Sequence, residues 1–170
     1  MERGSIKSLT FISLCVAMMA IISQLSVPIG AVPITLQALS VAFIGYFLGV
    51  KKGLVAILAY ILLGAVGAPV FAGFQGGFHM LIGYTGGFIF GFVPFTCLCG
   101  IGSKKWVKIA LGMLGLLLCH IIGIIQYSIL AGLKLWLSFL SVSLPYLLKD
   151  IMLTASAYFI AEKVKQIKRC

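Results

Sequence analysis

The sequence predicts an all-α membrane protein in which six transmembrane helices form a single domain over residues 1–170. Hydrophobic residues make up 62% of the chain and charged residues only 9%, with a mean hydropathy of +1.20. A soluble domain of this size could not cover so much apolar surface. Six apolar stretches each approach the roughly 17–25 residues that cross a hydrocarbon core. Lys and Arg gather in every second gap between these stretches.

Each stretch has its own boundary signals. The six stretches cover residues 9–27, 34–50, 54–70, 83–101, 107–131 and 138–161. The first has a basic flank like a signal peptide, but its apolar run exceeds the roughly 7–15 residues of an h-region, so we expect a retained helix. Pro28 and Pro33 separate the first stretch from the second. Lys51 and Lys52 divide the second from the third, and Pro145 interrupts the start of the sixth.

The basic residues predict the topology. Their four clusters precede the first stretch, separate the second from the third and the fourth from the fifth, and follow the sixth; the other gaps hold only Lys134. Because short cytoplasmic loops carry an excess of Lys and Arg, we expect all four clusters and both termini on the cytoplasmic side of the cell membrane. The net charge of +10 therefore indicates contact with anionic membrane lipid. It does not indicate nucleic-acid binding, since the charges are spread over membrane-flanking loops.

Between the third and fourth stretches lies a glycine-rich segment that we expect to be irregular. Glycines recur from residue 64 to residue 91, around Pro69. Non-helical backbone is tolerated at membrane depth only where it is buried in protein or lines a cavity. We therefore expect residues 71–87 to line a cavity on the outer side. The alternative is that the glycines only let the third and fourth helices pack closely.

Asp150 is the strongest candidate for a functional residue. The chain has three acidic residues, and only Asp150 lies inside an apolar stretch, about one helical turn beyond Pro145. A charged carboxylate in hydrocarbon costs roughly 2.5–3.5 kcal/mol, so it marks either a ligand site or a structural hydrogen bond. The adjacent Lys149 points about 100° away on a helix, which disfavours a direct pair and leaves Lys149 free to extend to the outer interface. Expected partners of Asp150 are a ligand N–H group, Gln75, Gln126, Tyr84 and Lys134.

Three motifs resemble one known family. They are SQLSVPIGAVPITLQ at residues 23–37, LLGAVGAPVFAGFQGG at residues 62–77 and GYTGGFIFGF at residues 83–92. In this order, and with six apolar stretches, they resemble the biotin-specific S components, of BioY type, of energy-coupling-factor (ECF) transporters. The resemblance implies a high-affinity S component that captures biotin on the outer side. An ECF transmembrane coupling protein and two ATPase subunits would then power its delivery inward.

The resemblance also implies where the ligand is held. The family's loop between the first two helices caps the pocket and corresponds here to residues 28–33. Its glycine-rich segment contributes pocket backbone and polar groups. The matching positions are Phe74, Gln75, Gly76, Gly77, Tyr84, Thr85 and Gly86.

The sixth stretch departs from the family. The family pattern is Pro-Phe-x-Pro-Gly-Asp-x-x-Lys, whereas residues 145–153 read PYLLKDIML. Asp150 keeps the Asp, but Leu153 stands at the Lys position. Either Lys149 or Lys134 supplies the cation instead, or backbone amides hold the ligand carboxylate.

The chemistry of biotin fits the same residues. Its ureido ring has two N–H donors and a carbonyl, its second ring is apolar, and its side chain ends in a carboxylate; such a ligand suits a small apolar pocket with a few polar groups. Asp150 would accept a ureido N–H in a charge-assisted hydrogen bond. Gln75, Thr85 and Tyr84 would serve the carbonyl. The expected ring contacts are Phe71, Phe74, Phe78 and Tyr146.

Energy for transport has to come from a partner. The chain has no GxxxxGK[ST] phosphate loop and no acidic pair for magnesium. Ser13, Ala17 and Ala20 form a small-residue stripe on which another membrane protein would pack closely. The family docks its coupling subunit through such a stripe, and packing within the chain is the alternative.

Other functions are weighed against the same residues. An intramembrane enzyme needs a nucleophile with a base or a metal set, whereas His79 and His120 have no partners at ligand spacing, and we expect His120 to be a core residue. We expect no metal, no cofactor and no catalysis. An S component for thiamine or riboflavin would keep the architecture, and a cationic ligand would suit Asp150 without an essential lysine. A pore is disfavoured because no helix carries a polar stripe.

Overall fold

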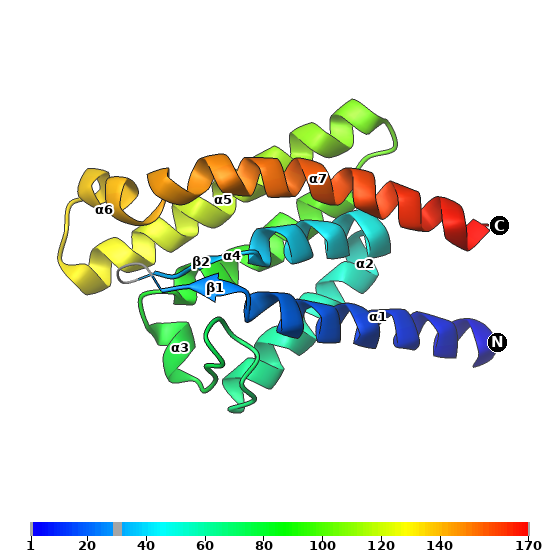
Figure 1. Ribbon diagram of the computed structural model, residues 1–170, viewed down its shortest axis with the longest axis horizontal. Coiled ribbons are helices and arrows are strands. Elements are labelled where there is room, and N and C mark those ends of the chain that lie inside the picture. Colours follow the sequence, from blue (N-terminus) through cyan, green and yellow to red (C-terminus); the bar gives the residue numbers. More distant parts are fainter. Residues whose placement is uncertain (1, 29–31, 170) are drawn as a thin grey trace.

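The chain folds into a bundle of helices that is described by a computed structural model for residues 2–28 and 32–169. The elements are α1 (Glu2–Ser23), β1 (Ser26–Val27), β2 (Ile34–Thr35), α2 (Gln37–Ala65), α3 (His79–Ile82), α4 (Gly86–Gly100), α5 (Lys105–Ala131), α6 (Leu135–Val142) and α7 (Leu144–Arg169). Both chain ends lie at one end of the molecule, and α3, α6 and the two strands lie at the other (Figure 1). The predicted helical fold class is confirmed.

Several helices have the length and apolarity of membrane spans. Residues Ile6–Ser23 of α1, all of α2 and all of α5 meet both conditions among the described residues. The pair α6 and α7, bent by 55° at the break between them, adds a fourth candidate if it counts as one span. Helix α4 is apolar but has only 15 residues. The chain is therefore a multi-pass membrane protein.

The second and third predicted stretches form one element, α2, with a break inside it. Gly49 has φ 75° and ψ 179°, a conformation that glycine adopts without steric cost because it has no Cβ. The chain folds back at this residue, so the two halves of α2 run in different directions (Figure 1). The second half ends at Ala65, short of residue 70, because residues 66–77 form turns and irregular backbone instead of helix.

Two other boundaries differ from the prediction. The break in the last stretch falls at Ser143, just before Pro145. That proline lies in the first turn of α7, where its missing N–H removes no intrahelical hydrogen bond. Between α1 and α2 the chain forms an antiparallel hairpin of β1 and β2, with Ser26 opposite Thr35. The predicted loop at residues 28–33 falls between these strands in the sequence, and its residues 29–31 lie outside the described part of the chain.

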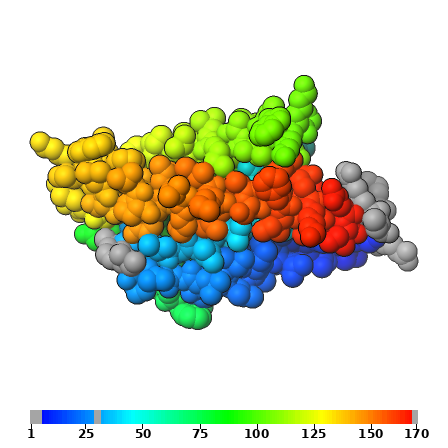
Figure 2. Space-filling model, turned by 45° about the horizontal axis from the view of Figure 1, so that its top comes forward, coloured from blue at the N-terminus to red at the C-terminus, as the bar shows by residue number. Residues whose placement is uncertain are grey.

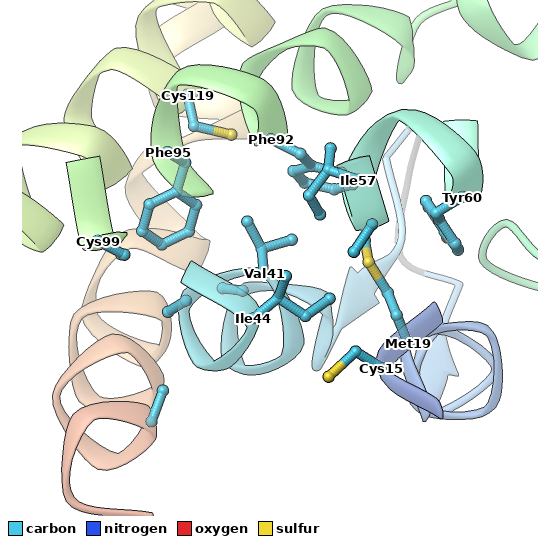
Figure 3. Close-up of a cluster of buried hydrophobic side chains, with 14 of the residues drawn as sticks. Cys15, Met19, Val41, Ile44, Ile57, Tyr60, Phe92, Phe95, Cys99 and Cys119 are labelled. Atoms are coloured by element: carbon cyan, nitrogen blue, oxygen red, sulfur yellow. The ribbon is translucent and has the colours of Figure 1, made fainter. Parts of the chain in front are cut away.

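The core forms where α1, α2, α4 and α5 meet (Figure 3). A Cβ on Gly91 would lie 2.7 Å from Cys119 Cα, and one on Gly87 would lie 2.6 Å from Ile122 O. These two glycines therefore let α4 approach α5 closely. The sequence interpretation of close packing holds for them, but their partner is the fifth stretch and not the third.

Helix α7 lies between α5 on one side and α1 and the start of α2 on the other. Figure 2 shows it crossing one face of the molecule, with α5 along one side and α1 and the start of α2 along the other. At the end with the chain termini, Glu162 of α7 pairs with Lys108 of α5 at 3.2 Å and with Lys165 at 3.0 Å. At the opposite end the same helix carries Asp150.

Candidate functional site

A cavity of about 640 Å³ lies toward the end of the bundle where the hairpin, α3 and the α6–α7 junction meet. Its wall is mostly apolar and includes a few polar groups, as small-molecule sites usually do. It reaches inward to Phe95 and Leu116, which belong to α4 and α5. The cavity is therefore bounded by segments that lie far apart in the sequence.

The β1–β2 hairpin forms one wall and is tied to α7. Pro28, Val32 and Pro33 line the cavity. The Tyr146 hydroxyl donates to Val32 O at 2.7 Å, and Lys149 Nζ donates to Thr35 O at 2.5 Å. Both bonds start on α7 and end on hairpin backbone, so the described ends of this loop are held beside the cavity.

A tight turn over residues 71–75 forms another part of the wall. The Phe71 N–H donates to Gln75 O at 2.9 Å and closes the turn. Phe74 has φ 57°, a left-handed conformation that is uncommon for a bulky residue. Its N–H donates to Gln24 Oε1 at 2.7 Å, and its ring is 71% exposed at the cavity wall. The end of α1 therefore holds Phe74 in place.

The segment between α3 and α4 is positioned by α5. Gln126 of α5 donates through Nε2 to Leu81 O at 2.9 Å and to Gly83 O at 2.8 Å. These bonds satisfy the carbonyl of Leu81, in the last turn of α3, and that of its C-cap residue Gly83. Tyr84 and Thr85 follow directly and line the cavity. Gln126 was a predicted partner of Asp150, but its amide serves this turn.

The predicted ligand residues fall into two groups. Those that line the cavity are Phe74, Gln75, Tyr84, Thr85, Tyr146, Lys149 and Asp150. Gly76, Gly77 and Gly86 are absent from the described lining. A Cβ on Gly76 would meet Ala68 O at 2.3 Å, and the Gly77 N–H donates to Gly64 O at 2.6 Å. Gly86 is buried against Leu81, so these three glycines shape the backbone around the site.

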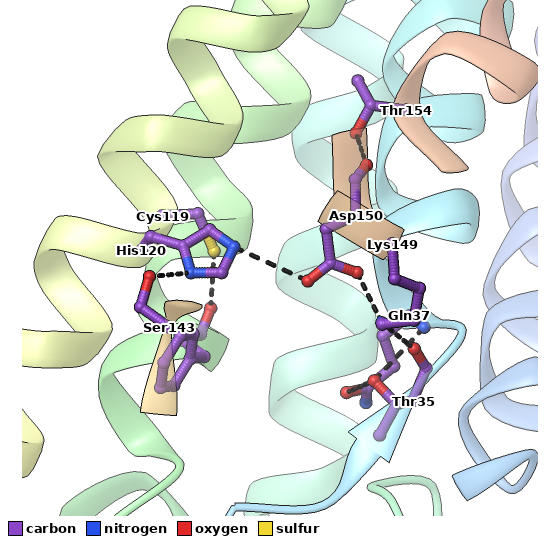
Figure 4. Close-up of polar contacts among 9 residues, drawn as sticks. Thr35, Gln37, Cys119, His120, Ser143, Lys149, Asp150 and Thr154 are labelled. Carbon is purple, nitrogen blue, oxygen red and sulfur yellow. Dashed lines mark hydrogen bonds and ion pairs between the residues drawn. The ribbon is translucent and has the colours of Figure 1, made fainter. Parts of the chain in front are cut away.

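Asp150 lies at the centre of a polar cluster inside the cavity (Figure 4). It is 8% exposed; Lys149 Nζ lies 2.5 Å from its Oδ1 and His120 Nε2 lies 3.5 Å from its Oδ2. The expectation that Lys149 and Asp150 do not pair is wrong. Their Cα–Cβ bonds diverge, but the flexible four-carbon stem of lysine curves back to the neighbouring carboxylate.

His120 is the site residue that the sequence interpretation assigned to the core. It is 5% exposed, lines the cavity and has Ser143 Oγ 2.8 Å from its Nδ1. Spacing gives no hint of this cluster, because α5 and α7 contribute its members separately. The sequence did contain one signal for His120. Burying a polar side chain in an apolar helix costs free energy, and this argument, which identified Asp150, applies to the imidazole as well.

Ser143, His120 and Asp150 have the composition of a hydrolase triad but not its function. Ser143 is 1% exposed and does not belong to the described cavity lining, so its hydroxyl cannot reach a bound molecule. Within residues 2–28 and 32–169, no group of three or more His, Cys, Asp or Glu side chains is placed to hold a metal ion. The arrangement is suited to binding a polar group.

The whole chain is similar to known proteins. A family model described as the BioY family matches residues 1–169. The probable biotin transporter BioY of Pyrococcus horikoshii is 39% identical over 159 residues, which cover 94% of this chain and 96% of that protein. The biotin transporter BioY of Thermotoga maritima is 40% identical over 113 residues, covering 64% of this chain and 66% of that one. The crystal structure of an S-component for biotin from an ECF-type ABC transporter has a TM-score of 0.90 at 25% identity, covering 98% of this chain and 94% of that chain.

Proposed function

Because the chain belongs to the BioY family, we propose that it is the high-affinity biotin-binding S component of an ECF-type vitamin uptake transporter. The matched relatives are named transporters and the matched structure is an S-component, so the chain is a transport protein and not an enzyme. The observation that carries the proposal is a mostly apolar cavity with Asp150 and Lys149 side by side in its wall. No cofactor is needed for this role.

The two charged residues match the two ends of biotin. Asp150 accepts a ureido N–H in a charge-assisted hydrogen bond. Lys149 carries the one ammonium group among the described lining residues, and it serves the ligand carboxylate by turning its flexible stem away from Asp150, which it contacts at 2.5 Å. Leu153, at the family's lysine position, packs against the hydrophobic core, and Lys134 is exposed outside the described lining. These placements favour Lys149 over Lys134 as the replacement cation.

The membrane arrangement we propose has six crossings in one domain. They are α1, the two halves of α2 on either side of Gly49, α4, α5, and α6 together with α7. Lys51, Lys52 and Lys104 then lie with the chain ends at the cytoplasmic face of the cell membrane, beside anionic lipid. The cavity faces outward, at the opposite end of the bundle.

The proposed energy source is an ECF transmembrane coupling protein with two ATPase subunits. Ser13 and Ala17 of α1 are exposed, and Ala20 is half-buried. The stripe is therefore open to close packing by another membrane helix, which favours docking over packing within the chain.

Calorimetric titration of the detergent-purified chain with biotin, after removal of any co-purified ligand, tests the proposal. We expect tight one-to-one binding that thiamine and riboflavin do not displace. Asp150→Asn should weaken it roughly 10- to 100-fold, because a hydrogen bond to a charged group is lost. Glu162→Gln makes the same change in charge at the other end of α7 and should leave affinity unchanged.

A thiamine or riboflavin signal without a biotin signal would keep the architecture and change the ligand. Biotin binding that Asp150→Asn leaves intact would remove Asp150 from the site. No response to any of the three vitamins would contradict the proposed function.

A further inference from the structure

We propose that His120, held by Ser143, is a positioning residue that fixes Asp150 and makes the site prefer a neutral hydrogen-bond donor over a cationic group. The inference rests on the proposed binding of biotin and adds to it a residue and a basis of selectivity. Asp150 alone would favour a cation. His120 and Lys149 together change that preference.

Each carboxylate oxygen of Asp150 faces a side chain from a different helix. Lys149 Nζ of α7 lies at Oδ1, and His120 Nε2 of α5 lies 3.5 Å from Oδ2 (Figure 4). A distance of 3.5 Å is beyond a normal hydrogen bond, so His120 acts on the carboxylate mainly through its charge or dipole. The carboxylate plane is thereby set by contacts from both sides.

The imidazole of His120 is itself oriented from two directions. Its Nδ1 lies 2.8 Å from Ser143 Oγ, and its ring meets the Phe88 ring edge-on at 5.8 Å between centroids. An Nε2 that faces a carboxylate is stable there when it carries the proton, and Nδ1 of the neutral ring then accepts from the Ser143 hydroxyl. The carboxylate of Asp150 thus favours the tautomer with the proton on Nε2, and Ser143 holds the ring in the orientation that points this N–H toward Asp150.

The remaining polar groups around Asp150 add no negative charge. Cys119 Sγ lies 3.5 Å from Phe88 O, the Tyr146 hydroxyl is bonded to Val32 O, and Thr154 Oγ1 donates to the Asp150 backbone carbonyl. The Lys149 ammonium reduces the negative potential at Oδ1, and the N–H dipole of His120 faces Oδ2. A neutral N–H still finds free lone pairs on the carboxylate, which has about four acceptor sites. A cationic group gains less there than it would from an isolated carboxylate.

The test compares biotin with 2-iminobiotin, whose guanidinium carries a positive charge in place of the neutral urea. Affinities of both ligands are measured by calorimetry at neutral pH for the parent chain, His120→Leu and His120→Gln. His120→Leu should weaken biotin roughly 10-fold and move the biotin-to-iminobiotin affinity ratio at least roughly 10-fold toward the cation. His120→Gln retains an N–H donor of similar reach and should keep a ratio close to that of the parent.

The affinity ratio separates positioning from a general structural effect, because a loosened bundle weakens both ligands together. An unchanged ratio in His120→Leu, with biotin still bound by the parent, would overturn the inference and leave the proposed function intact. If His120→Leu does not fold, Ser143→Ala gives the same comparison. A shift toward iminobiotin supports the inference and an unchanged ratio rejects it. A parent chain that does not bind biotin would reject both proposals.

Discussion

At the residue scale, the Lys149 ammonium contacts Thr35 O and the Asp150 carboxylate and also lines the cavity, where the proposed function assigns it to the ligand carboxylate. When the ammonium turns to a ligand carboxylate, Asp150 still has His120 beside its second oxygen. The cost of leaving a buried charge without a partner is thereby reduced. His120 therefore remains a partner of Asp150 when Lys149 turns away from it.

We expect Lys149→Met to remove the preference for a ligand with a free carboxylate. The parent should bind biotin more tightly than biotin methyl ester, by roughly 10-fold, because the ester cannot form a charge-assisted bond with the ammonium. In Lys149→Met the two affinities should be equal within a factor of about two. Titration calorimetry with both ligands measures this, and Lys134→Met, which removes an exposed lysine outside the described lining, is the control. A preference that persists in Lys149→Met would assign the carboxylate to another group.

Asp150 was predictable from the sequence, and its neighbours were only partly so. A lone carboxylate in an apolar stretch carries an energetic cost that the sequence shows directly. His120 depends on how α5 is rotated against α7, and the contact of Lys149 depends on a side-chain conformer. Neither is encoded in residue spacing, so both required the three-dimensional structure.

At the scale of elements, the 71–75 turn places a strained residue in the wall of the cavity. Phe74 adopts a left-handed conformation that costs roughly 1–2 kcal/mol for a residue with a Cβ. The Gln24 side chain holds it there at the cavity wall. Strain of this kind persists where the surrounding structure enforces it, and it concentrates at ligand sites.

Two substitutions at Phe74 separate strain from ligand contact. Phe74→Gly and Phe74→Ala both remove the ring, so both should weaken biotin binding by a similar factor. Only glycine relieves the left-handed conformation, so Phe74→Gly should have a free energy of unfolding about 1 kcal/mol higher than Phe74→Ala. Thermal and denaturant unfolding in detergent measure the difference. Equal stabilities would show that the turn relaxes around alanine.

Helix boundaries show what apolar patterns can and cannot predict. The length of α5 follows from continuous apolar sequence, whereas α1 begins at Glu2, before the expected stretch of residues 9–27, and ends at Ser23. The break at Gly49 and the bend at Ser143 each lie two residues before a predicted interruption, at Lys51 and Pro145, but their exact positions do not follow from the pattern, because a residue that permits a turn does not require one. The hairpin was missed because its strands are two residues each and pair across the loop at residues 28–33.

The exposed face of α1 leads to a prediction about partners. Ala17→Leu adds bulk to the small-residue stripe and should prevent close approach of another membrane helix. We expect biotin binding by the isolated chain to be unchanged and ATP-driven biotin uptake in cells with the complete transporter to fall at least several-fold. Leu14→Phe, at an already bulky exposed position of the same helix, should leave uptake unaffected. Normal uptake by Ala17→Leu would place the docking surface elsewhere.

At the scale of the whole molecule, charge and cavity lie at opposite ends. Lys108, Lys165 and Glu162 form ion pairs near the chain termini, whereas Asp150 and Lys149 lie toward the hairpin end. In the proposed orientation, the first end lies at the cytoplasmic surface and the second receives the solute. The same helix, α7, runs between them, so a solute bound at Asp150 is attached to an element that extends to the opposite end.

The proposed orientation predicts which loops can be labelled from outside the cell. Single cysteines at Lys134 and Lys104 would be introduced into a chain whose five native cysteines are replaced by serine or alanine. Because Lys134 lies between α5 and α6 and Lys104 between α4 and α5, they fall on opposite sides of the bundle. A membrane-impermeant maleimide should label Lys134→Cys in intact cells and Lys104→Cys only after permeabilisation, provided that biotin uptake or binding confirms each variant is folded. The reverse pattern would turn the cavity toward the cytoplasm, and the basic residues would then lie outside, against the distribution of Lys and Arg that membrane insertion favours.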